Sequence, residues 1–69
     1  MARGTIKRLI RDRGFGFITP EGARTDLFFH STVVEGVSFE QLSEGQQVEF
    51  DVTTDPRRQQ ERAEHVRPA

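Results

Sequence analysis

Aromatic residues recur at every second position in two short segments of the sequence, where they could stack on a flat ligand. Phe15 and Phe17 are separated by one glycine, and Phe28 and His30 are separated by Phe29. In an extended strand, side chains two positions apart leave the same face. The exposed face of a strand usually carries polar residues, so three phenyl rings and an imidazole there indicate a binding surface. Unpaired nucleic-acid bases stack on such rings for roughly 1–3 kcal/mol each.

Two ordinary explanations compete with this interpretation. The three phenylalanines could fill a core, but Ile18, Leu27 and Phe29 already occupy the inward face by the same alternation. His30 could be a solvated histidine at a strand edge. Its position two residues after Phe28 favours a place on the aromatic face instead.

Basic residues are concentrated around the first aromatic segment, although the whole chain has a net charge of −1. Residues 1–24 contain six basic and two acidic groups, and residues 25–55 contain seven acids and no Lys or Arg. Residues 56–69 contain four Arg and two Glu. The distribution of charge, more than its sum, decides whether a face attracts phosphate. Each of these cations could still be ordinary solvated charge.

Five short strands are expected to hold these residues in place. They cover residues 4–10, 15–19 and 27–30, a stretch after a turn at 43–46, and about 62–67. Polar turns at 11–14 and 43–46, short connections at 21–25 and 55–61, and a helical turn near residue 31 capped by Ser31 would join them. Closing such a small sheet into a barrel removes its exposed edges, so an all-β barrel is the expected fold.

The expected core follows the alternation of apolar residues. In the fourth strand, residues 48, 50 and 52 face inward. In the fifth, the three-residue spacing of Ala63 and Val66 indicates a bulge. The predicted core residues are Ile6, Ile18, Leu27, Phe29, Val33, Leu42, Val48, Phe50, Val52 and Val66.

The composition argues against several other classes of protein. The chain has 69 residues and no cysteine, so disulfides and thiolate chemistry are excluded and a reducing, cytoplasmic location is expected. We see neither an apolar run long enough to span a membrane nor a signal peptide. Two histidines without cysteine form no recognisable zinc pattern, and the adjacent His30 and Ser31 have no catalytic context. We therefore expect no metal, no cofactor and no enzymatic activity.

A family resemblance rests on two segments, Gly14-Phe15-Gly16-Phe17-Ile18 and Leu27-Phe28-Phe29-His30. They resemble the paired ribonucleoprotein-type motifs of cold shock domain proteins. The similarity continues through Gly4-Thr5-Ile6-Lys7 and through the stretch from Leu42 to Phe50, and so covers nearly the whole chain. It implies a single cold shock domain over residues 1–69 with a five-stranded antiparallel oligonucleotide-binding (OB) fold.

The resemblance also implies a function. Proteins of this family bind single-stranded RNA or DNA with low sequence specificity and act as nucleic-acid chaperones in gene expression or cold adaptation. Lys7 and Arg13 match basic positions of the motif and would contact phosphates or bases. Phe39 matches a position that often holds an aromatic residue at the rim of the binding face, although it could instead plug the end of the barrel. A monomer or weak dimer is expected.

The chain departs from the family pattern at three aromatic positions. Where the family usually has Trp-Phe-Asn, this sequence has Arg8-Leu9-Ile10, and Ser31 stands where a phenylalanine often follows the histidine. The Arg8 guanidinium can still stack on a base and attract phosphate. The reduced aromatic face leaves a second function open, a small barrel that docks a protein partner.

Overall fold

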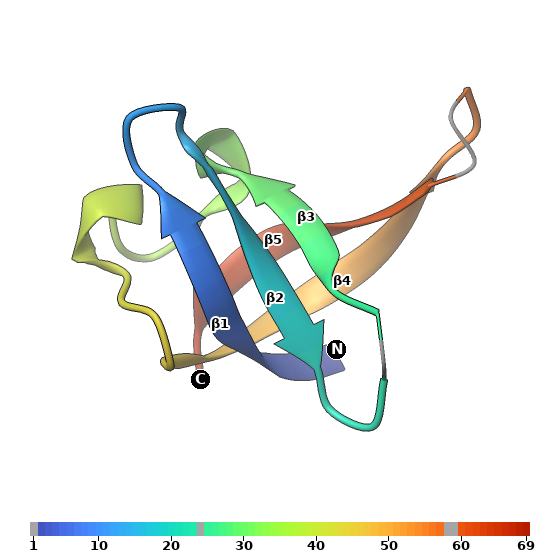
Figure 1. The fold of residues 1–69 in the computed structure, drawn as a ribbon, viewed down its shortest axis with the longest axis horizontal. Coiled ribbons are helices and arrows are strands. Elements are labelled where there is room, and N and C mark those ends of the chain that lie inside the picture. Colours follow the sequence, from blue (N-terminus) through green and yellow to red (C-terminus); the bar gives the residue numbers. More distant parts are fainter. Residues whose placement is uncertain (1, 24, 58–59) are drawn as a thin grey trace.

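The computed structural model of the chain is a closed five-stranded barrel (Figure 1). It describes residues 2–23, 25–57 and 60–69. The strands are Ala2–Ile10 (β1), Phe15–Pro20 (β2), Leu27–His30 (β3), Gln47–Asp55 (β4) and Gln60–Pro68 (β5). Two short 3₁₀ helices, Ser31–Val33 (η1) and Phe39–Gln41 (η2), lie in the connection between β3 and β4. The predicted all-β barrel is confirmed. The predicted connections 21–25 and 55–61 include positions 24 and 58–59, which lie outside the described residues.

The strands neighbour one another in the order β1-β2-β3-β5-β4. Four of the contacts are antiparallel, but β3 and β5 run parallel where Phe28 pairs with Arg62. The expectation of a purely antiparallel barrel is therefore wrong at this seam. The reason is geometric: β2 and β4 both run against β1, so β3 and β5 both run with it and must be parallel where they meet.

The buried core lies inside the barrel and is formed by apolar residues from all five strands and the β3–β4 connection. Its members are Ile6, Ile18, Leu27, Phe29, Phe39, Leu42, Val48, Phe50, Ala63 and Val66. Eight of the ten residues expected there are buried, and Val33 is half-buried and packs against the core.

Val52 is the clear error in the predicted core, because its side chain is 47% exposed. It pairs with the buried Ala63 and so keeps the inward orientation that the alternation predicts. At this point, however, β4 and β5 extend beyond the other strands (Figure 1). Val52 therefore faces an open hollow, which it lines beside Leu27 and Phe28.

Two irregularities in the strands determine which side chains reach solvent. The β4–β5 pairing shifts between Glu49 and Asp51, and His65 on β5 has a φ of +52°. This confirms the bulge predicted from the spacing of Ala63 and Val66. A second shift, in β1, leaves Lys7 as an extra residue between the paired positions 6 and 8.

The predicted turns are largely as expected. The 11–14 and 43–46 connections are turns, with φ of +74° at Gly14 and +88° at Gly45. The helical turn after β3 is η1, but its cap is His30 and not Ser31, because the His30 ring accepts a hydrogen bond from the Thr32 backbone N–H.

Candidate nucleic-acid interface

Four aromatic side chains meet on the outer face of β2 and β3. Phe15 pairs with His30 and Phe17 pairs with Phe28 across the two strands. The Phe15 and Phe28 ring centroids are 5.4 Å apart, those of Phe15 and Phe17 5.8 Å, and those of Phe17 and Phe28 6.1 Å. We call these four residues the aromatic platform. The outward arrangement predicted from the alternation is present.

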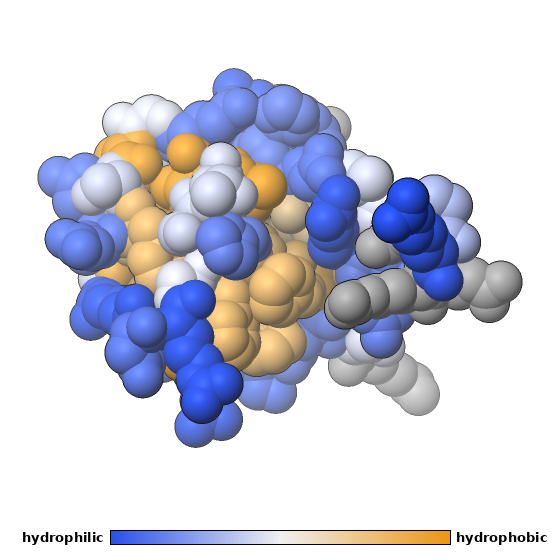
Figure 2. Space-filling model, turned by 90° about the horizontal axis from the view of Figure 1, so that it is seen from above, coloured by the Kyte–Doolittle hydropathy of each residue, from blue (hydrophilic) through white to orange (hydrophobic). Residues whose placement is uncertain are grey.

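The platform is open to solvent while its neighbours in sequence are not. Phe28 is 38% exposed, and Phe15 and Phe17 are half-buried. The residues that follow Phe17 and Phe28 in the sequence point inward: Ile18 and Phe29 are both 0% exposed. Figure 2 shows an apolar patch with hydrophilic side chains around it on the face seen from above.

Gly16 allows β2 to pack closely against β1 and against the Phe29 ring. A Cβ atom at this position would be 2.7 Å from the Arg8 carbonyl oxygen and 2.8 Å from the Phe29 ring. Both distances are shorter than real Cβ contacts, so any side chain would push β2 away from β1 or displace the ring below it. The glycine between the two platform phenylalanines is thus required by packing.

His30 has one ring nitrogen engaged and the other available. Its Nδ1 accepts a hydrogen bond from the Thr32 backbone N–H at 3.2 Å and lies 3.1 Å from Thr32 Oγ1. Because Nδ1 accepts, a neutral ring carries its proton on Nε2. The capping role therefore orients the exposed imidazole beside Phe15 and leaves Nε2–H to donate to a ligand.

The three predicted cations are exposed, but they differ in their surroundings. Arg8 lies directly opposite Phe17 across the β1–β2 pairing, and Arg13 lies in the β1–β2 turn. Lys7 Nζ forms an ion pair with Asp26 Oδ2 at 3.0 Å. Because Lys7 is the extra residue of the bulge in β1, two consecutive cations face solvent at this point.

Asp26 is held in its charged form. Thr19 Oγ1 donates a hydrogen bond to Asp26 Oδ1 at 2.7 Å. This hydrogen bond, together with the hydrogen bond and positive charge of Lys7, lowers the pKa of the Asp26 carboxyl. A phosphate that approaches Lys7 must therefore share it with a carboxylate.

Two further residues, Phe39 and Arg11, make contacts that support the fold. Phe39 is buried in the core, with its ring centroid 6.0 Å from that of Phe29. Of the two places expected for Phe39, the structure shows the inner one, because η2 turns the ring into the core and not toward the rim of the binding face. Arg11 donates a hydrogen bond from a guanidinium nitrogen to the Leu42 carbonyl oxygen at 2.7 Å, and so ties the end of β1 to the segment after η2.

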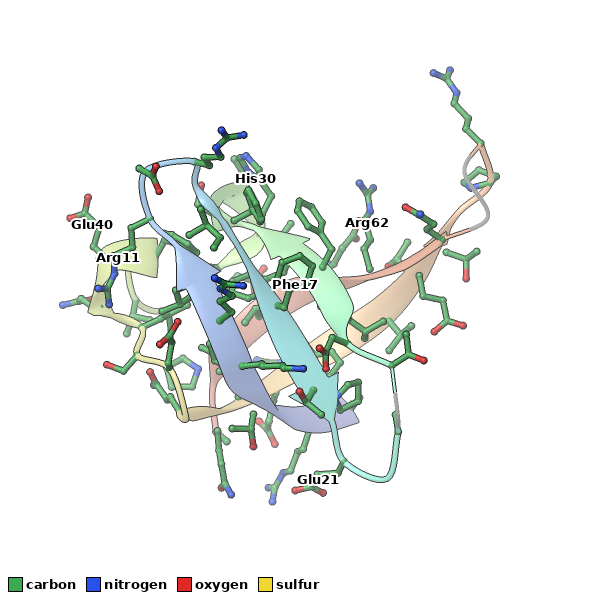
Figure 3. All side chains as sticks on the ribbon, viewed as in Figure 1. Arg11, Phe17, Glu21, His30, Glu40 and Arg62 are labelled. Carbon is green, nitrogen blue, oxygen red and sulfur yellow. The ribbon has the colours of Figure 1, made fainter. Side chains whose placement is uncertain are left out.

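Arg62 lies beside the aromatic platform, although nothing in the sequence indicated this position. It pairs with Phe28 across the parallel seam, and the labelled side chains in Figure 3 show Phe17, His30 and Arg62 on neighbouring strands. No local pattern marks this arginine, because its position depends on which strand closes the barrel next to β3.

A hollow of about 730 Å³ opens beside Phe17 and Phe28. The β2–β3 loop and the β4–β5 hairpin line the rest of it, with Pro20, Leu27, Val52, Asp26 and Glu61 among the lining residues. The platform therefore has an apolar extension with acidic groups along its wall.

Metal and membrane features are absent from the described part of the chain. Among residues 2–23, 25–57 and 60–69, no group of three or more potential ligands lies close enough to hold a metal ion. Within the same ranges, no helix has the length and hydropathy needed to cross a bilayer.

A closed five-stranded barrel with outward-facing aromatic rings on β2 and β3 and cations on β1 defines an OB-fold domain of the kind that binds nucleic acids. Among known families, the "'Cold-shock' DNA-binding domain" model matches residues 2–69 of this chain. The chain belongs to the cold-shock domain family, whose members are nucleic-acid-binding proteins without enzymatic activity.

Individual relatives agree with this assignment. The chain is 44% identical over 57 residues to "Probable cold shock protein A" of Mycolicibacterium smegmatis. The aligned region covers 83% of this chain and 85% of the relative. It is 38% identical over 69 residues to "Cold shock protein CspA" of Rhizobium meliloti, which covers 100% of both. The "Cold shock-like protein" of Aquifex aeolicus is 47% identical over 53 residues, with 77% of this chain and 76% of the relative covered.

Proposed function

We propose that this protein binds single-stranded RNA or DNA with little sequence preference by stacking bases on the aromatic platform. The observation that carries the proposal is the contact between Phe15, Phe17 and Phe28, whose ring centroids lie 5.4–6.1 Å apart on a solvent-facing surface. A duplex buries the faces of its bases, so only an unpaired strand can offer them to these rings. Stacking requires a π-face and no particular base, so binding is expected to be tolerant of sequence.

Charge supplies the second part of the interaction. Arg8 and Arg13 are exposed near the platform and would attract phosphates, with Lys7 contributing when it leaves Asp26. We leave Phe39 out of the contact surface because it is buried. Its contact with Phe29 supports the core on the inner side of β3.

The biological role that fits such binding is to keep RNA or DNA strands unpaired. A protein that stacks on bases competes with base pairing, which is the action of a nucleic-acid chaperone. We propose that the chain does this in the cytoplasm, in gene expression or cold adaptation, as a single domain that acts as a monomer or weak dimer without a metal or cofactor.

One observation favours a second candidate function, the docking of a protein partner. The hollow beside Phe28 is partly apolar, and Val52 in its wall is 47% exposed. An exposed apolar surface of this kind is compatible with a protein contact. The two functions differ in their response to salt, because counterions compete with phosphate binding and have little effect on apolar contacts.

The test is a titration of a labelled oligothymidine at two salt concentrations. The label is placed on the oligonucleotide because the protein contains no Trp or Tyr. We expect saturable binding that weakens steeply between about 50 mM and about 200 mM salt, as phosphate contacts require. A duplex of the same length is the control and should bind more weakly. Equal affinity for the duplex, or affinity that does not depend on salt, contradicts the proposal.

A further inference from the structure

Two arginines from distant parts of the sequence lie at the ends of one row of side chains across the barrel. Arg8 pairs with Phe17, Phe17 with Phe28, and Phe28 with Arg62. Directly paired residues place their side chains on the same face of a sheet. We call these four residues the cross-strand row.

We propose that Arg62, at the β5 end of the cross-strand row, is a second phosphate contact for a single strand bound on the aromatic platform. This inference rests on the proposed function. It adds a cation on the side of the platform opposite Arg8.

The geometry places a cation on each side of the stacking surface. Neighbouring strands are roughly 4.8 Å apart, so the two phenylalanines occupy the middle of the row and the arginines its ends. Bases stacked on Phe17 and Phe28 would have a guanidinium on either side. Arginine suits this position because its planar fork of donors can bind two oxygens of one phosphate.

The present partner of Arg62 does not prevent this contact. Arg62 and Glu64 form an ion pair with a 3.1 Å separation, and their side chains are 49% and 28% exposed. Exposed ion pairs of this kind contribute little to stability, so a phosphate can take the place of the carboxylate.

The acidic wall of the hollow favours the same contact. Asp26 and Glu61 line the hollow beside Phe28. A phosphate chain directed into the hollow would approach these carboxylates, whereas one directed along the cross-strand row would meet Arg62. Repulsion and attraction thus both favour the contact with Arg62.

A matched pair of substitutions tests the role of Arg62. Arg3 is an exposed arginine on β1, paired with Glu49 of β4, and its guanidinium lies 3.1 Å from the Glu49 carboxylate. Arg62→Gln and Arg3→Gln therefore each remove one positive charge from a surface Arg–Glu pair with a 3.1 Å separation. The slope of log K against log salt is measured for wild type and both variants with an oligothymidine long enough to cross the barrel, after thermal unfolding has shown that all three are folded.

We expect Arg62→Gln to lower the magnitude of the slope by about 1, as one lost phosphate contact requires, and Arg3→Gln to leave it unchanged. Arg8→Gln should have an effect similar to that of Arg62→Gln, and the two together should lower the slope by about 2. If Arg62→Gln behaves like Arg3→Gln while the wild type binds, this inference alone is wrong. If the wild type does not bind single strands, the proposed function fails and this inference fails with it.

Discussion

Phe28 and Phe29 are adjacent in the chain but lie on opposite sides of β3. The Phe28 side chain is 38% exposed and contacts the rings of Phe15 and Phe17. The Phe29 side chain is 0% exposed and packs against Phe39 in the core. One residue type at two consecutive positions is therefore expected to serve binding in one case and stability in the other.

The first prediction separates these two roles. Phe28→Ala should weaken oligonucleotide binding by roughly 1–3 kcal/mol, the value of one stacked base. Phe29→Ala should lower the free energy of unfolding by about 3–5 kcal/mol, as is typical when a buried phenylalanine is truncated. The measurements are a binding titration for the first variant and chemical denaturation for both. Equal destabilisation by the two substitutions would show that Phe28 belongs to the core.

The second prediction concerns Arg8, which stands where the family usually has tryptophan. A tryptophan would offer a larger stacking surface, whereas the guanidinium acts mainly through its charge and loses side-chain entropy when fixed. Arg8→Trp should therefore bind a thymine-rich strand more tightly than wild type at high salt, where screening weakens the native cation. Arg8→Ala should weaken binding mainly at low salt. If Arg8→Trp gives no gain at high salt, position 8 lies off the stacking surface.

The third prediction tests the close packing at Gly16. Gly16→Ala should lower the free energy of unfolding by about 1–3 kcal/mol, because the added methyl group overlaps the Arg8 carbonyl and the Phe29 ring. Gly22→Ala is the control: a Cβ atom at Gly22 has nothing within 4 Å, and only the positive φ of 74° opposes it. Denaturation of both variants should show the larger loss for Gly16→Ala. The reverse order would mean that β2 has room to move.

The fourth prediction uses the His65–Glu35 pair. His65 Nδ1 lies 2.7 Å from Glu35 Oε2 and joins the bulge in β5 to the segment after η1. The hydrogen bond with Glu35 and the negative charge of its carboxylate raise the pKa of His65. A histidine whose pKa is higher in the folded state adds stability that is fully present below its unfolded pKa, about 6.5, and is lost as pH rises through the folded pKa.

Glu35→Gln should accordingly lower the melting temperature more at about pH 5.5 than at about pH 9. Both side chains are more than half exposed, so the difference is expected to be small and is best read from paired melting curves. Glu21→Gln, in the exposed loop after β2, is the control for the general effect of removing a carboxylate. A destabilisation by Glu35→Gln that is equal at the two pH values would show that the ion pair has no role in it.

The sequence predicted the features that depend on local alternation. Phe15, Phe17 and Phe28 lie outside and Ile18 and Phe29 inside, because side chains alternate within each short strand. The bulge in β5 was also predictable, because the buried residues in that strand are three positions apart and a regular strand requires an even spacing.

The features that the sequence did not predict depend on contacts between distant segments. Val52 has the correct orientation but no cover, because β4 continues past the end of the barrel. Phe39 lies in an irregular connection where no periodicity indicates its direction. Arg62 reaches the platform only because β5 lies beside β3, a pairing set by the closure of the whole barrel.

The parallel seam has a consequence for the dynamics of the barrel. In the described part of the chain, β3 and β5 share the single pair Phe28–Arg62, and one further bridge joins Val34 to Val66. With so few paired residues, this line is expected to open more readily than the β4–β5 ladder, and its amides should exchange hydrogen for deuterium sooner. A nucleic-acid strand held by Arg8 on one side and Arg62 on the other would span that line. Its binding should therefore slow hydrogen exchange at the β3–β5 seam more than elsewhere, because it would hold these two strands together from the outer face.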